Sequence, residues 1–586
     1  MALDLTPEQK AAGKANFEQA AGDLARAGKM DSMVTGGTDP TKPDRRDFIK
    51  ATVAAGAVVP VSAAVYFGYN SWKGNKAVRT ALIGTGDEGG VLVGDHNPEY
   101  NEIVAVCDIR PTNLDRIFEG EKAPSPRKGL NGLYGKDSGK KIARYTTVES
   151  LLADAKKLGL EGVVIATPLH THDTIAKLCM DAGLHVLCEK LMASSITKCK
   201  EMIRYAKDKG LLLSVGHQRH YSTLYAHAIE VLQNGILGDV KHIRAQWPRN
   251  NSWPFTATAA DKEKFATGND IDGKPFDLPY YRDGWCKPVL AADAEPFLKE
   301  PQKLRDLGYN SITELTRWRL YEKTGGGLMA ELGSHQLDAS SIILGHVHPL
   351  AVSGIGGKYF YGPGRNDRES LDGVFVTYEF PGPNHPKGAK HGKDESDIVI
   401  VTYSSFNSNS FEDYGECVMG SRGTMILSKE AEVYLYKEPE PGKGASGGRD
   451  TKVTVTGAGG GKAAMEATST WGGGGGAAIS KGAAVGWDSA VRGYRTEMEH
   501  FAYCVRMWQK RGGKVDYSKN EKGELVNKEI IPRCHGEVAM ADAILALSAN
   551  MVMHKDYKEK RLAYEDAWFD STKDDVPETK HAPKKA

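Results

Sequence analysis

The sequence lacks an excess of charge of either sign, a paired-cysteine motif and a long unbroken hydrophobic run. Its 586 residues contain 76 Lys and Arg and 75 Asp and Glu, and neither sign clusters, which argues against a nucleic-acid-binding surface. The 8 cysteines are scattered without a CxxC pair, so neither a disulfide framework nor a zinc site is expected. The most apolar stretch, 51–69, is interrupted by Pro60 and rich in Ala and Gly, which makes it weak as a spanning helix.

The chain is too long for one hydrophobic core, so we expect two domains with appendages. From residue 76 to 215, short β-branched runs such as VRTALIG, IVAVCD and GVVIATP alternate with helical stretches, a pattern typical of a parallel sheet with crossover helices. From 216 to 570, runs such as DVKHIRAQW and DIVIVTYSS indicate longer antiparallel strands. The predicted fold is an α/β domain followed by an α+β domain with a mostly antiparallel sheet.

Two stretches of the second domain are predicted to be inserts. Residues 250–315 are irregular and rich in Trp, Tyr and Pro, and residues 438–486 include GAGGGK and WGGGGGAA, a composition typical of a flexible linker. The segment 533–550 has helical apolar periodicity and is expected to pack back on the first domain. Residues 571–586, rich in Lys and Pro, are expected to form a disordered tail.

The N-terminal residues 1–44 contain one predicted helix, which Thr6 would cap and Pro7 would begin. Because this helix has few large apolar residues, we expect a tail outside the core. RRDFIK at 45–50 then resembles the twin-arginine export signal, although an Asp precedes the arginines where Ser or Thr is usual.

We therefore expect residues 45–70 to be a twin-arginine (Tat) signal or an anchor. The Tat translocation machinery would then be a partner and the protein would be periplasmic or otherwise exported. Cleavage near Val61-Ser62-Ala63 and an uncut membrane anchor over 51–69 both remain open. The alternative is a basic turn before a buried helix.

A glycine-rich turn follows the first predicted strand. GTGDEGG at 84–90 places Gly84, Gly86 and Gly89 in the glycine positions of G-x-G-x-x-G, with Thr85 inside the turn. The glycines permit a tight turn, close approach of the backbone to a pyrophosphate, and close packing of helix on strand. The free N–H groups and the dipole of the following helix favour phosphate. The pattern predicts a Rossmann dinucleotide-binding domain; the alternative is a glycine turn in an unrelated α/β protein.

Asp108 closes the next predicted strand, where an acidic side chain accepts hydrogen bonds from both ribose hydroxyls and repels a 2′-phosphate. This favours NAD as the cofactor. Arg110, two residues further on, leaves NADP open as the less favoured choice.

More polar motifs fall at the carboxyl ends of predicted strands, where open sheets bind ligands. With the glycine turn, the stretches ATPLHTH (166–172), CEKLMA (188–193), GHQRHYS (216–222), GGGLMAELGSHQLD (325–338) and GSRGTM (420–425) resemble, in family order, the motifs of the Gfo/Idh/MocA oxidoreductases. The resemblance implies an NAD(P)-dependent enzyme that oxidises a CH–OH group of a sugar, sugar derivative or cyclitol. It also implies a homo-oligomer.

The resemblance assigns roles to individual residues. Lys190 would hold the substrate hydroxyl beside the nicotinamide, and Glu189 would contact the cofactor ribose. Leu191 replaces a proline that in the family often carries a cis peptide bond and sets the lysine. Further cofactor contacts implied by the motifs are Thr167, Pro168, His172 and Arg219.

Glu331, His335 and Asp338 recur at i, i+4 and i+7 and would share one helix face. His335 is the candidate general base, because the pKa of histidine lies in the useful range, and Glu331 would orient it or touch a substrate hydroxyl. Asp338 is expected to form an internal salt bridge or cap. The alternatives are a core histidine at His335 and a surface lysine at Lys190.

Other polar and aromatic residues are weaker candidates. Tyr221 would line the domain interface beside Arg219. Four tryptophans in or beside the first insert either stack on a sugar or bury apolar area; they are Trp247, Trp253, Trp285 and Trp318. HVH at 346–348 lacks a third ligand at a suitable spacing, so no metal site is predicted.

Three functions remain open. The leading one is an NAD(P)-dependent sugar or cyclitol oxidoreductase. The second is a redox-neutral glycoside hydrolase or lyase that works through a transient keto-sugar and uses a tightly held NAD. The third is a catalytically weakened sugar-binding protein. Because the twin-arginine route carries folded proteins and an exported enzyme cannot rely on fresh NAD, we expect the cofactor to be retained.

Overall fold

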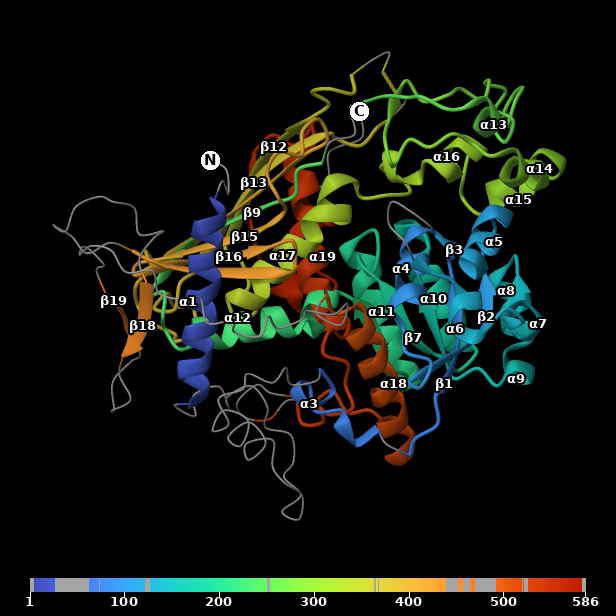
Figure 1. Cartoon of the computed structure of the whole chain (residues 1–586). Helices are drawn as coiled ribbons and strands as arrows, with labels where there is room; N and C mark the ends of the chain where they lie inside the picture. The colour runs from blue at the N-terminus through green and yellow to red at the C-terminus, as the bar shows by residue number, and fades with distance from the viewer. Residues whose placement is uncertain are drawn as a thin grey trace.

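The computed structural model describes residues 5–26, 63–72, 74–121, 127–249, 253–362, 365–366, 368–438, 452–456, 464–468, 492–518, 520 and 525–581. Two large sheets lie side by side, each with its own helices (Figure 1). The twin-arginine stretch at 45–50 and the glycine run at 471–478 lie outside the described residues. The predictions made for them therefore stay predictions.

The first domain has a six-stranded parallel sheet in the order β5-β2-β1-β6-β7-β8. Every residue of the last three of these strands is buried, as expected where helices cover both faces. The strand order reverses between β1 and β6, which is the switch point where open sheets bind ligands. The predicted Rossmann-type sheet is confirmed. The strands are β1 (Val78–Ile83), β2 (Asn101–Cys107), β5 (Ala143–Tyr145), β6 (Gly162–Ile165), β7 (His185–Glu189) and β8 (Leu213–Gly216).

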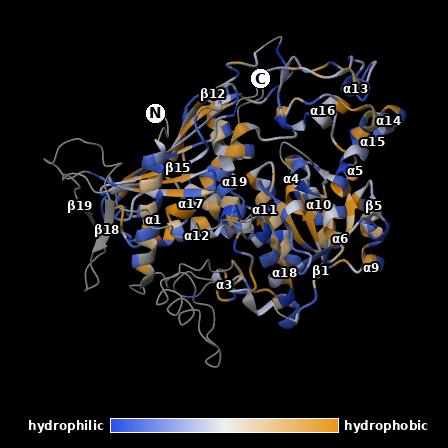
Figure 2. Ribbon diagram, viewed as in Figure 1, coloured by the Kyte–Doolittle hydropathy of each residue, from blue (hydrophilic) through white to orange (hydrophobic). Residues whose placement is uncertain are grey.

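Helices cover the two faces of this sheet with apolar side chains, and hydrophobic residues follow the strands and the inner faces of the helices (Figure 2). One face packs against α10 (His172–Asp181) and α11 (Ile196–Lys209). The other packs against α4 (Asp87–Asp95), α5 (Pro111–Glu119) and α18 (Tyr494–Lys510), the last of which returns from late in the sequence. Shorter helices on the rim are α6 (Leu130–Tyr134), α7 (Ser138–Lys141), α8 (Val148–Ala153) and α9 (Ala155–Leu158).

The second domain has an eight-stranded sheet in the order β17-β16-β15-β9-β14-β13-β12-β20. All neighbouring strands are antiparallel except the parallel pair β14–β9, so the predicted mostly antiparallel sheet is confirmed. α12 (Thr223–Gln233) and α17 (Ser334–Ile343) pack on it. The strands are β9 (Val240–Gln246), β12 (Ala351–Gly357), β13 (Gly373–Pro381), β14 (Ile398–Phe406), β15 (Gly415–Gly420), β16 (Gly423–Ser428), β17 (Glu432–Lys437) and β20 (Arg561–Ala563).

Helix α19 (Gly536–Met553) lies between the two domains, where it contacts α11 and β8 on one side and β12 and α17 on the other. Among the described residues it is the one helix long and apolar enough to cross a membrane. However, 67% of its apolar window is buried inside the protein, as in a core helix of a globular fold.

The N-terminal helix α1 (Pro7–Arg26) begins where predicted, and Thr6 Oγ1 accepts a hydrogen bond from the Gln9 amide at 3.2 Å. The expectation that it stays outside the core does not hold, because Phe17, Ala20 and Leu24 are buried. It packs on β17, where a Cβ at Gly13 would meet Tyr436 Oη at 2.4 Å. The helix thus packs against the sheet through the close approach that small residues such as Gly13 allow, and it needs few large apolar side chains to do so.

Residues 63–72 are part of the packed protein. They form α3 (Ala63–Tyr66) and the short helix η1 (Asn70–Trp72), and Tyr66, Phe67, Tyr69 and Trp72 join the core of the first domain. Tyr69 Oη donates a hydrogen bond to Glu499 Oε2 at 2.7 Å. A membrane anchor over the whole of 51–69 does not fit this structure, because the last residues of that stretch pack inside the protein.

The predicted insert at 250–315 is a small helical unit with its own apolar core. In Figure 1 it lies above α4 and α5 of the first domain. It contains the strand pair β10 (Trp253–Pro254) and β11 (Tyr281–Arg282) and the helices α13 (Ala259–Lys262), α14 (Ala291–Lys299), α15 (Pro301–Asp306) and α16 (Ile312–Thr316). Its core includes Ala266, Val289, Ala294, Phe297, Leu304, Tyr309, Ile312 and Leu315.

Two further segments differ from expectation. Within 438–486, predicted as a flexible linker, β18 (Lys452–Thr456) and β19 (Ala464–Thr468) form an antiparallel hairpin. The C-terminal tail is ordered as far as α20 (Pro577–His581). It is tied to α11, because Lys200 Nζ donates to the carbonyl oxygens of Lys573 at 2.9 Å and Asp575 at 2.8 Å.

Candidate active site

The glycine turn after β1 has the shape that its sequence predicts. Gly84 has φ +90°, and a Cβ there would meet the Ala166 carbonyl oxygen at 2.4 Å. A Cβ at Gly89 would meet the Gly84 carbonyl oxygen at 2.3 Å. At Gly86 the nearest atom to an added Cβ is Asn113 Nδ2, 4.0 Å away. The turn is therefore crowded beneath and open at the N-terminus of α4, which fits close approach of a pyrophosphate.

Asp108 lies at the end of β2, beside the glycine turn. Its Oδ2 accepts hydrogen bonds from the Thr85 amide at 2.8 Å and the Thr85 hydroxyl at 3.1 Å, and its Oδ1 accepts from the Arg110 amide at 2.8 Å. These bonds orient the carboxylate at the edge of the open turn, where an adenosine ribose binds in this fold.

The Arg110 side chain turns away from that edge and binds the insert. Its Nε and Nη2 donate to Asp293 Oδ2 at 3.0 and 2.8 Å. Asp293 on α14 is buried, and its Oδ1 also accepts from the Thr112 amide and hydroxyl. Arg110 is therefore engaged within the protein, and the insert is fastened to the start of α5.

The first turn of α4 carries two acidic residues, Asp87 and Glu88, to which the sequence motifs assigned no role. Asp87 pairs with Arg116 at 2.9 Å and with Lys287 of the insert at 2.8 Å. Burial would raise the pKa of Asp87, but Lys287, Arg319 and Arg116 outweigh it and hold the pKa well below its usual value. These cations offset the negative charge of Asp87, so the N-terminus of α4 remains suited to a phosphate group.

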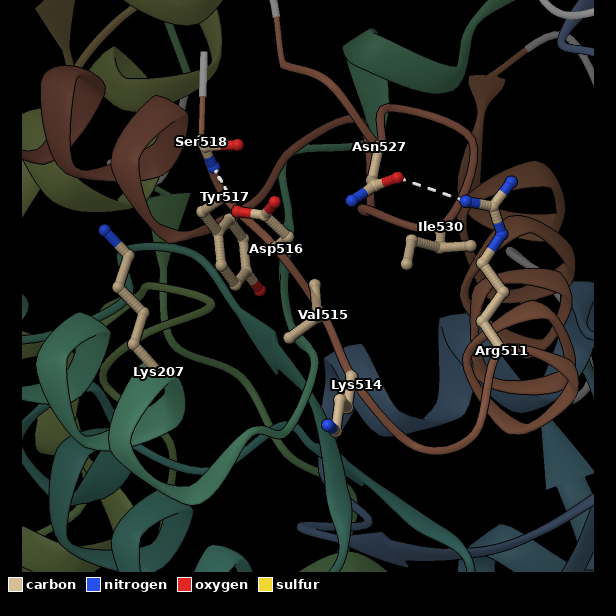
Figure 3. A pocket seen from close by; sticks show the side chains of 9 residues that line it. All are labelled: Lys207, Arg511, Lys514, Val515, Asp516, Tyr517, Ser518, Asn527 and Ile530. Atoms are coloured by element: carbon tan, nitrogen blue, oxygen red, sulfur yellow. Dashed lines mark hydrogen bonds between the residues drawn. The ribbon is translucent and has the colours of Figure 1, made fainter.

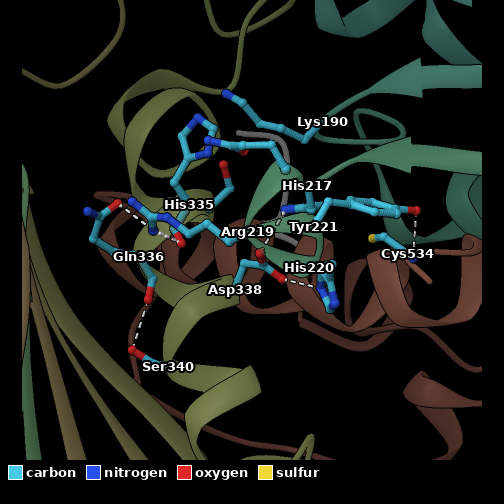
Figure 4. Close-up of polar contacts among 12 residues, drawn as sticks. Lys190, His217, Arg219, His220, Tyr221, His335, Gln336, Asp338, Ser340 and Cys534 are labelled. Carbon is cyan, nitrogen blue, oxygen red and sulfur yellow. Dashed lines mark hydrogen bonds and ion pairs between the residues drawn. The ribbon is translucent and has the colours of Figure 1, made fainter. Parts of the chain in front are cut away.

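Lys190 follows β7 and reaches the second domain. Its Nζ donates to the carbonyl oxygen of Glu331 at 2.8 Å and to that of Ala330 at 3.3 Å. Figure 4 shows its side chain extending toward the helix that carries His335. The Lys190–Leu191 peptide bond is cis, so Leu191 has the peptide geometry that the resemblance associates with proline at this position.

The predicted shared face of Glu331, His335 and Asp338 is not found. Residues Met329–Gly333 form a π-helical turn before α17, so the three side chains meet different partners. Glu331 Oε2 accepts from Arg319 Nε at 2.8 Å. Burial would raise the pKa of Glu331, but Arg319 and Lys190 lower it below its usual value. Glu331 is thus an ionised partner of Arg319.

His335 lies at the domain interface with its ring near the Trp247 ring, at a centroid distance of 5.5 Å. The residue is 8% exposed. Burial and then the positive charges of Lys190 and Arg219 lower its pKa well below the usual value. Its Nδ1 has no hydrogen-bond partner among the residues that the structure describes. His335 is therefore a neutral imidazole with an available acceptor.

Glu189 is buried at the end of β7 beside two other carboxyl groups. Burial, and then the negative charge of Glu88, raise the pKa of Glu189 well above its usual value. Glu497 on α18, which the sequence analysis missed, likewise has a strongly raised pKa because of burial and the charges of Glu189 and Glu88. A raised pKa lets a carboxyl group keep its proton to a higher pH, and a protonated carboxyl group is able to donate a hydrogen bond to a ribose hydroxyl.

His172 has a different task from the predicted cofactor contact. It is buried, and its Nδ1 and Nε2 lie 2.8 Å from the carbonyl oxygens of Leu191 and Thr167. The ring thus ties the end of β6 to the turn that follows Lys190. Pro168 precedes the short helix η2 (Leu169–Thr171), and Thr167 Oγ1 accepts from the Thr171 hydroxyl at 2.8 Å.

Arg219 and Tyr221 both lie at the domain interface, as predicted, but they bind protein partners there. The Arg219 side chain is fully buried and binds Glu416 Oε1 at 3.2 Å and Glu430 Oε1 at 2.9 Å. Tyr221 is buried, and its hydroxyl accepts from the Cys534 amide at 3.1 Å. Both residues join the domains internally, so the predicted cofactor contact of Arg219 does not fit its position.

The four tryptophans separate into two groups. Trp253 is 67% exposed on the insert, and Trp285 is buried beneath Arg249 and Arg368. Trp318 lies under the Arg319 guanidinium at 4.3 Å, and Trp247 stacks on Tyr414 at 4.3 Å and faces His335. Trp247 therefore lies beside His335, and Trp318 lies against Arg319, the partner of Glu331.

A cavity of about 550 Å³ lies elsewhere, between α11 and the segment after α18 (Figure 3). Two of its cations have partners: Lys207 pairs with Glu537 at 2.6 Å, and Arg511 binds Asn527 at 3.1 Å. None of the predicted site residues lines this cavity. The candidate active site is the switch-point crevice instead.

The sheet order, the open glycine turn and Asp108 define a dinucleotide-binding domain. Residues 78–217 match the family model described as "Oxidoreductase family, NAD-binding Rossmann fold" (GFO_IDH_MocA). This domain therefore matches the NAD-binding domain of the Gfo/Idh/MocA oxidoreductases, the family that the sequence motifs resemble.

Curated relatives of different activity match the chain. It is 30% identical over 213 residues to a "Glycosyl hydrolase family 109 protein" of Stenotrophomonas maltophilia. That alignment covers 34% of this chain and 41% of that protein. It is 32% identical over 190 residues to "Inositol 2-dehydrogenase 1" of Saccharopolyspora erythraea, covering 31% of this chain and 51% of that protein. The chain thus spans about half or less of the length of these relatives.

Among solved structures, an inositol dehydrogenase homolog from Azotobacter vinelandii, described as complexed with NADH and myo-inositol, aligns with a TM-score of 0.48. It shares 13% sequence identity, and the alignment covers 83% of this chain and 98% of that one.

Proposed function

We propose that the protein is an NAD-dependent oxidoreductase acting on a CH–OH group of a sugar, sugar derivative or cyclitol, with a tightly held cofactor. One observation carries the proposal. Lys190, at the carboxyl end of β7, reaches across the domain interface to the turn that carries Glu331 and leads to His335. This places an ammonium group and a neutral imidazole together at the switch-point crevice.

The residues at the crevice fit a dinucleotide. The open face at Gly86 and the N-terminus of α4 would hold the pyrophosphate, Asp108 the adenosine ribose, and Glu189 the second ribose. When bound, the nicotinamide would supply the hydride acceptor. NAD is preferred to NADP because Arg110, the candidate for a 2′-phosphate contact, is already bound to Asp293.

The chemistry of the chain follows from two side chains. Nζ of Lys190 has three N–H donors, of which two point to backbone carbonyl oxygens, leaving one for the substrate hydroxyl. His335 Nδ1 takes the proton of that hydroxyl as its carbon gives up hydride. Burial keeps His335 neutral at physiological pH, so the base is ready before the substrate arrives.

The insert supports tight retention of the cofactor. It is fastened to three places along the crevice: α14 holds Arg110 through Asp293, Lys287 pairs with Asp87 in the first turn of α4, and the Tyr309 ring packs edge-on against His170 after β6 at 5.1 Å. A dinucleotide along this edge would be covered by the insert, so its release would require the insert to move.

A second candidate is a redox-neutral glycoside hydrolase or lyase. The relative of glycosyl hydrolase family 109 favours it, and a retained cofactor suits chemistry in which hydride is taken and returned within one turnover. Purified protein mixed with a sugar panel should accumulate absorbance of reduced nicotinamide if it is a dehydrogenase. Release of chromophore from aryl glycosides without net reduction would favour the hydrolase. Loss of both activities with sugar binding retained would indicate a weakened binding protein.

Export through the Tat pathway to the periplasm is part of this proposal, on the strength of RRDFIK at 45–50. Because α1 and residues 63–72 both pack in the fold, we infer that the exported protein keeps both. The intact mass of protein from the exported fraction tests this. A mass that begins near residue 64 would show that the segment carrying α1 is removed.

We also propose a homo-oligomer that uses the open face of the second sheet. Ile355 on β12 and Phe375 on β13 are cross-strand partners, and they are 66% and 42% exposed. The ring of Tyr359, which lies near Phe375, belongs to a residue that is 63% exposed. Exposed apolar groups on one sheet face mark an interaction surface. Light scattering should show more than one chain per particle, and Ile355→Glu should shift the protein toward monomer.

A further inference from the structure

A buried group of polar side chains lies behind the candidate active site, where three elements meet. His217 follows β8, Asp338 lies on α17 and Asp542 lies on α19. One ligand-type atom from each lies within 4.8 Å of the other two. Figure 4 shows His217 and Asp338 facing each other, with His217 Nδ1 3.9 Å from Asp338 Oδ2.

Several polar atoms of these buried side chains lack a hydrogen-bond partner among the described residues. His217 is 0% exposed, and Asp338 and Asp542 are each 1% exposed. Within the described part of the chain, neither ring nitrogen of His217 has a hydrogen-bond partner, and neither does Asp338 Oδ2 or Asp542 Oδ1. An unsatisfied buried polar group destabilises the folded protein, and a charged one does so more strongly. A missing ligand would explain several such groups at one point.

The other oxygen of Asp338 is held in place. Asp338 Oδ1 lies 2.6 Å from His220 Nε2, and this contact orients the carboxylate. His220 in turn stacks on His346 at 5.5 Å. A carboxylate oriented by an outer histidine, with its second oxygen turned to the cluster, is typical of a metal ligand and its supporting shell.

We propose that His217, Asp338 and Asp542 bind one divalent transition-metal ion, of the kind represented by Zn²⁺ or Mn²⁺. An imidazole nitrogen and two carboxylate oxygens are a ligand set that such ions accept. Two carboxylates balance the charge of a divalent ion. Ligand atoms bound to one ion at about 2.1 Å lie at most about 4.2 Å apart. The His217–Asp338 spacing already meets this, and Asp542 needs only a small side-chain shift.

The cations nearest to the cluster are engaged elsewhere. Arg219 binds Glu416 and Glu430, and Arg533 Nε donates to the His220 carbonyl oxygen at 2.9 Å. An ion at this point would therefore be the direct counter-charge of the two carboxylates. It would fasten α17 and α19 to the end of β8, one helical turn from His335. Its role would be to position the helix that carries the proposed base.

Metal analysis of the full-length protein, purified without chelator, tests this site. We expect about one Zn²⁺ or Mn²⁺ per chain, and less than about a tenth of that in His217→Gln and Asp542→Asn. Protein refolded with ZnCl₂ or MnCl₂ should melt at a higher temperature than protein refolded with EDTA, and the two variants should lose this difference. Asp372→Asn is the matched control: it removes another buried carboxylate, which accepts from the Tyr361 amide, and should keep the metal.

The competing occupant is a single proton shared by Asp338 and Asp542. In that case Asp542→Asn, which imitates a protonated acid, would melt at or above the temperature of the unaltered protein. A metal content below about a tenth of an equivalent after refolding with either salt, together with no metal-dependent shift in melting, would overturn the proposal.

Discussion

Nζ of Lys190 lies 2.8 Å from the carbonyl oxygen of Glu331 and donates a hydrogen bond to it across the domain interface. The bond joins the end of β7 to the π-helical turn before α17. Any relative motion of the two domains would therefore change the position of the ammonium group with respect to His335. The proposed catalytic pair, Lys190 and His335, is assembled only while the two domains are together.

Replacement of Lys190 by Ala should lower kcat by about 10²- to 10⁴-fold, the usual contribution of a positioned proton-handling group. The stability of the fold should change little in comparison, because only the side chain beyond Cβ is lost. Steady-state kinetics with the best sugar of a panel would measure this. Lys209→Ala, at a partly exposed lysine of α11, should leave the rate unchanged. A Lys190→Ala enzyme with a near-normal rate would show that the site lies elsewhere.

The pH dependence of kcat/KM should report His335. Burial lowers its pKa well below 6.5, and a base must be unprotonated, so activity is present above this pKa and is lost as the pH falls through it. The acid limb of the profile should therefore lie well below pH 6.5. His335→Asn should lower the rate by about 10²- to 10⁴-fold and abolish that limb. An acid limb at or above pH 6.5, or one that survives in the variant, would count against His335 as the base.

Local sequence patterns were enough to predict the Rossmann sheet and the residues at the ends of its strands. Gly84, Gly89, Asp108 and Lys190 lie where expected, because each sits within a few residues of a buried strand whose position fixes it. His172 lies there too, but with its ring turned to the backbone. A sequence motif thus predicts where a residue lies, but the hydrogen-bond partners of its side chain determine its role.

The partners could not be predicted, because they come from distant segments. Asp293 holds Arg110 from within an insert that the composition described only as irregular. Arg319 takes Glu331 away from His335, and the π-helical turn breaks the i, i+4 geometry that an ideal α-helix would give. Glu497 returns to the crevice from α18. The burial of helix α1 was not predicted, because the helix packs closely through Gly13 and has few of the large apolar residues that indicate a core helix.

Asp293→Ala should loosen the insert and free Arg110. Loss of the charge-assisted bonds should speed cofactor release by about 10- to 100-fold, and the freed guanidinium should raise the affinity for NADP relative to NAD. Release can be followed by transfer of cofactor to an excess of a competing dehydrogenase. Asp306→Ala, at an exposed position of α15 in the same insert, is the control. Equal release rates in the two variants would mean that the insert does not retain the cofactor.

Glu161 and Arg506 should make a pH-dependent contribution to stability. Burial would raise the pKa of Glu161, but hydrogen bonds from Arg506, the Arg79 amide and Gln509 lower it from 4.5 to about 2. The stabilisation is therefore present above pH 4.5 and is lost as the pH falls toward 2. Glu161→Gln should lower the free energy of unfolding by about 2–3 kcal/mol at pH 7, measured by denaturant titration.

The matched control for Glu161 is Glu102→Gln, which removes a half-exposed partner of Arg79. It should cost less than about 1 kcal/mol. If the difference between the unaltered protein and Glu161→Gln stayed constant from pH 7 to pH 3, the ion pair would not be the source of the stability.

The central claim is that this chain holds a nicotinamide dinucleotide in the crevice between Gly86 and Lys190. Mass spectrometry of small molecules released from the gently purified, full-length protein tests it most directly. The account predicts NAD or NADH at about one molecule per chain, retained through dialysis, and lost from a Gly86→Trp variant whose side chain would fill the open turn. Protein that carries no nicotinamide dinucleotide, and binds none when it is supplied, would contradict it.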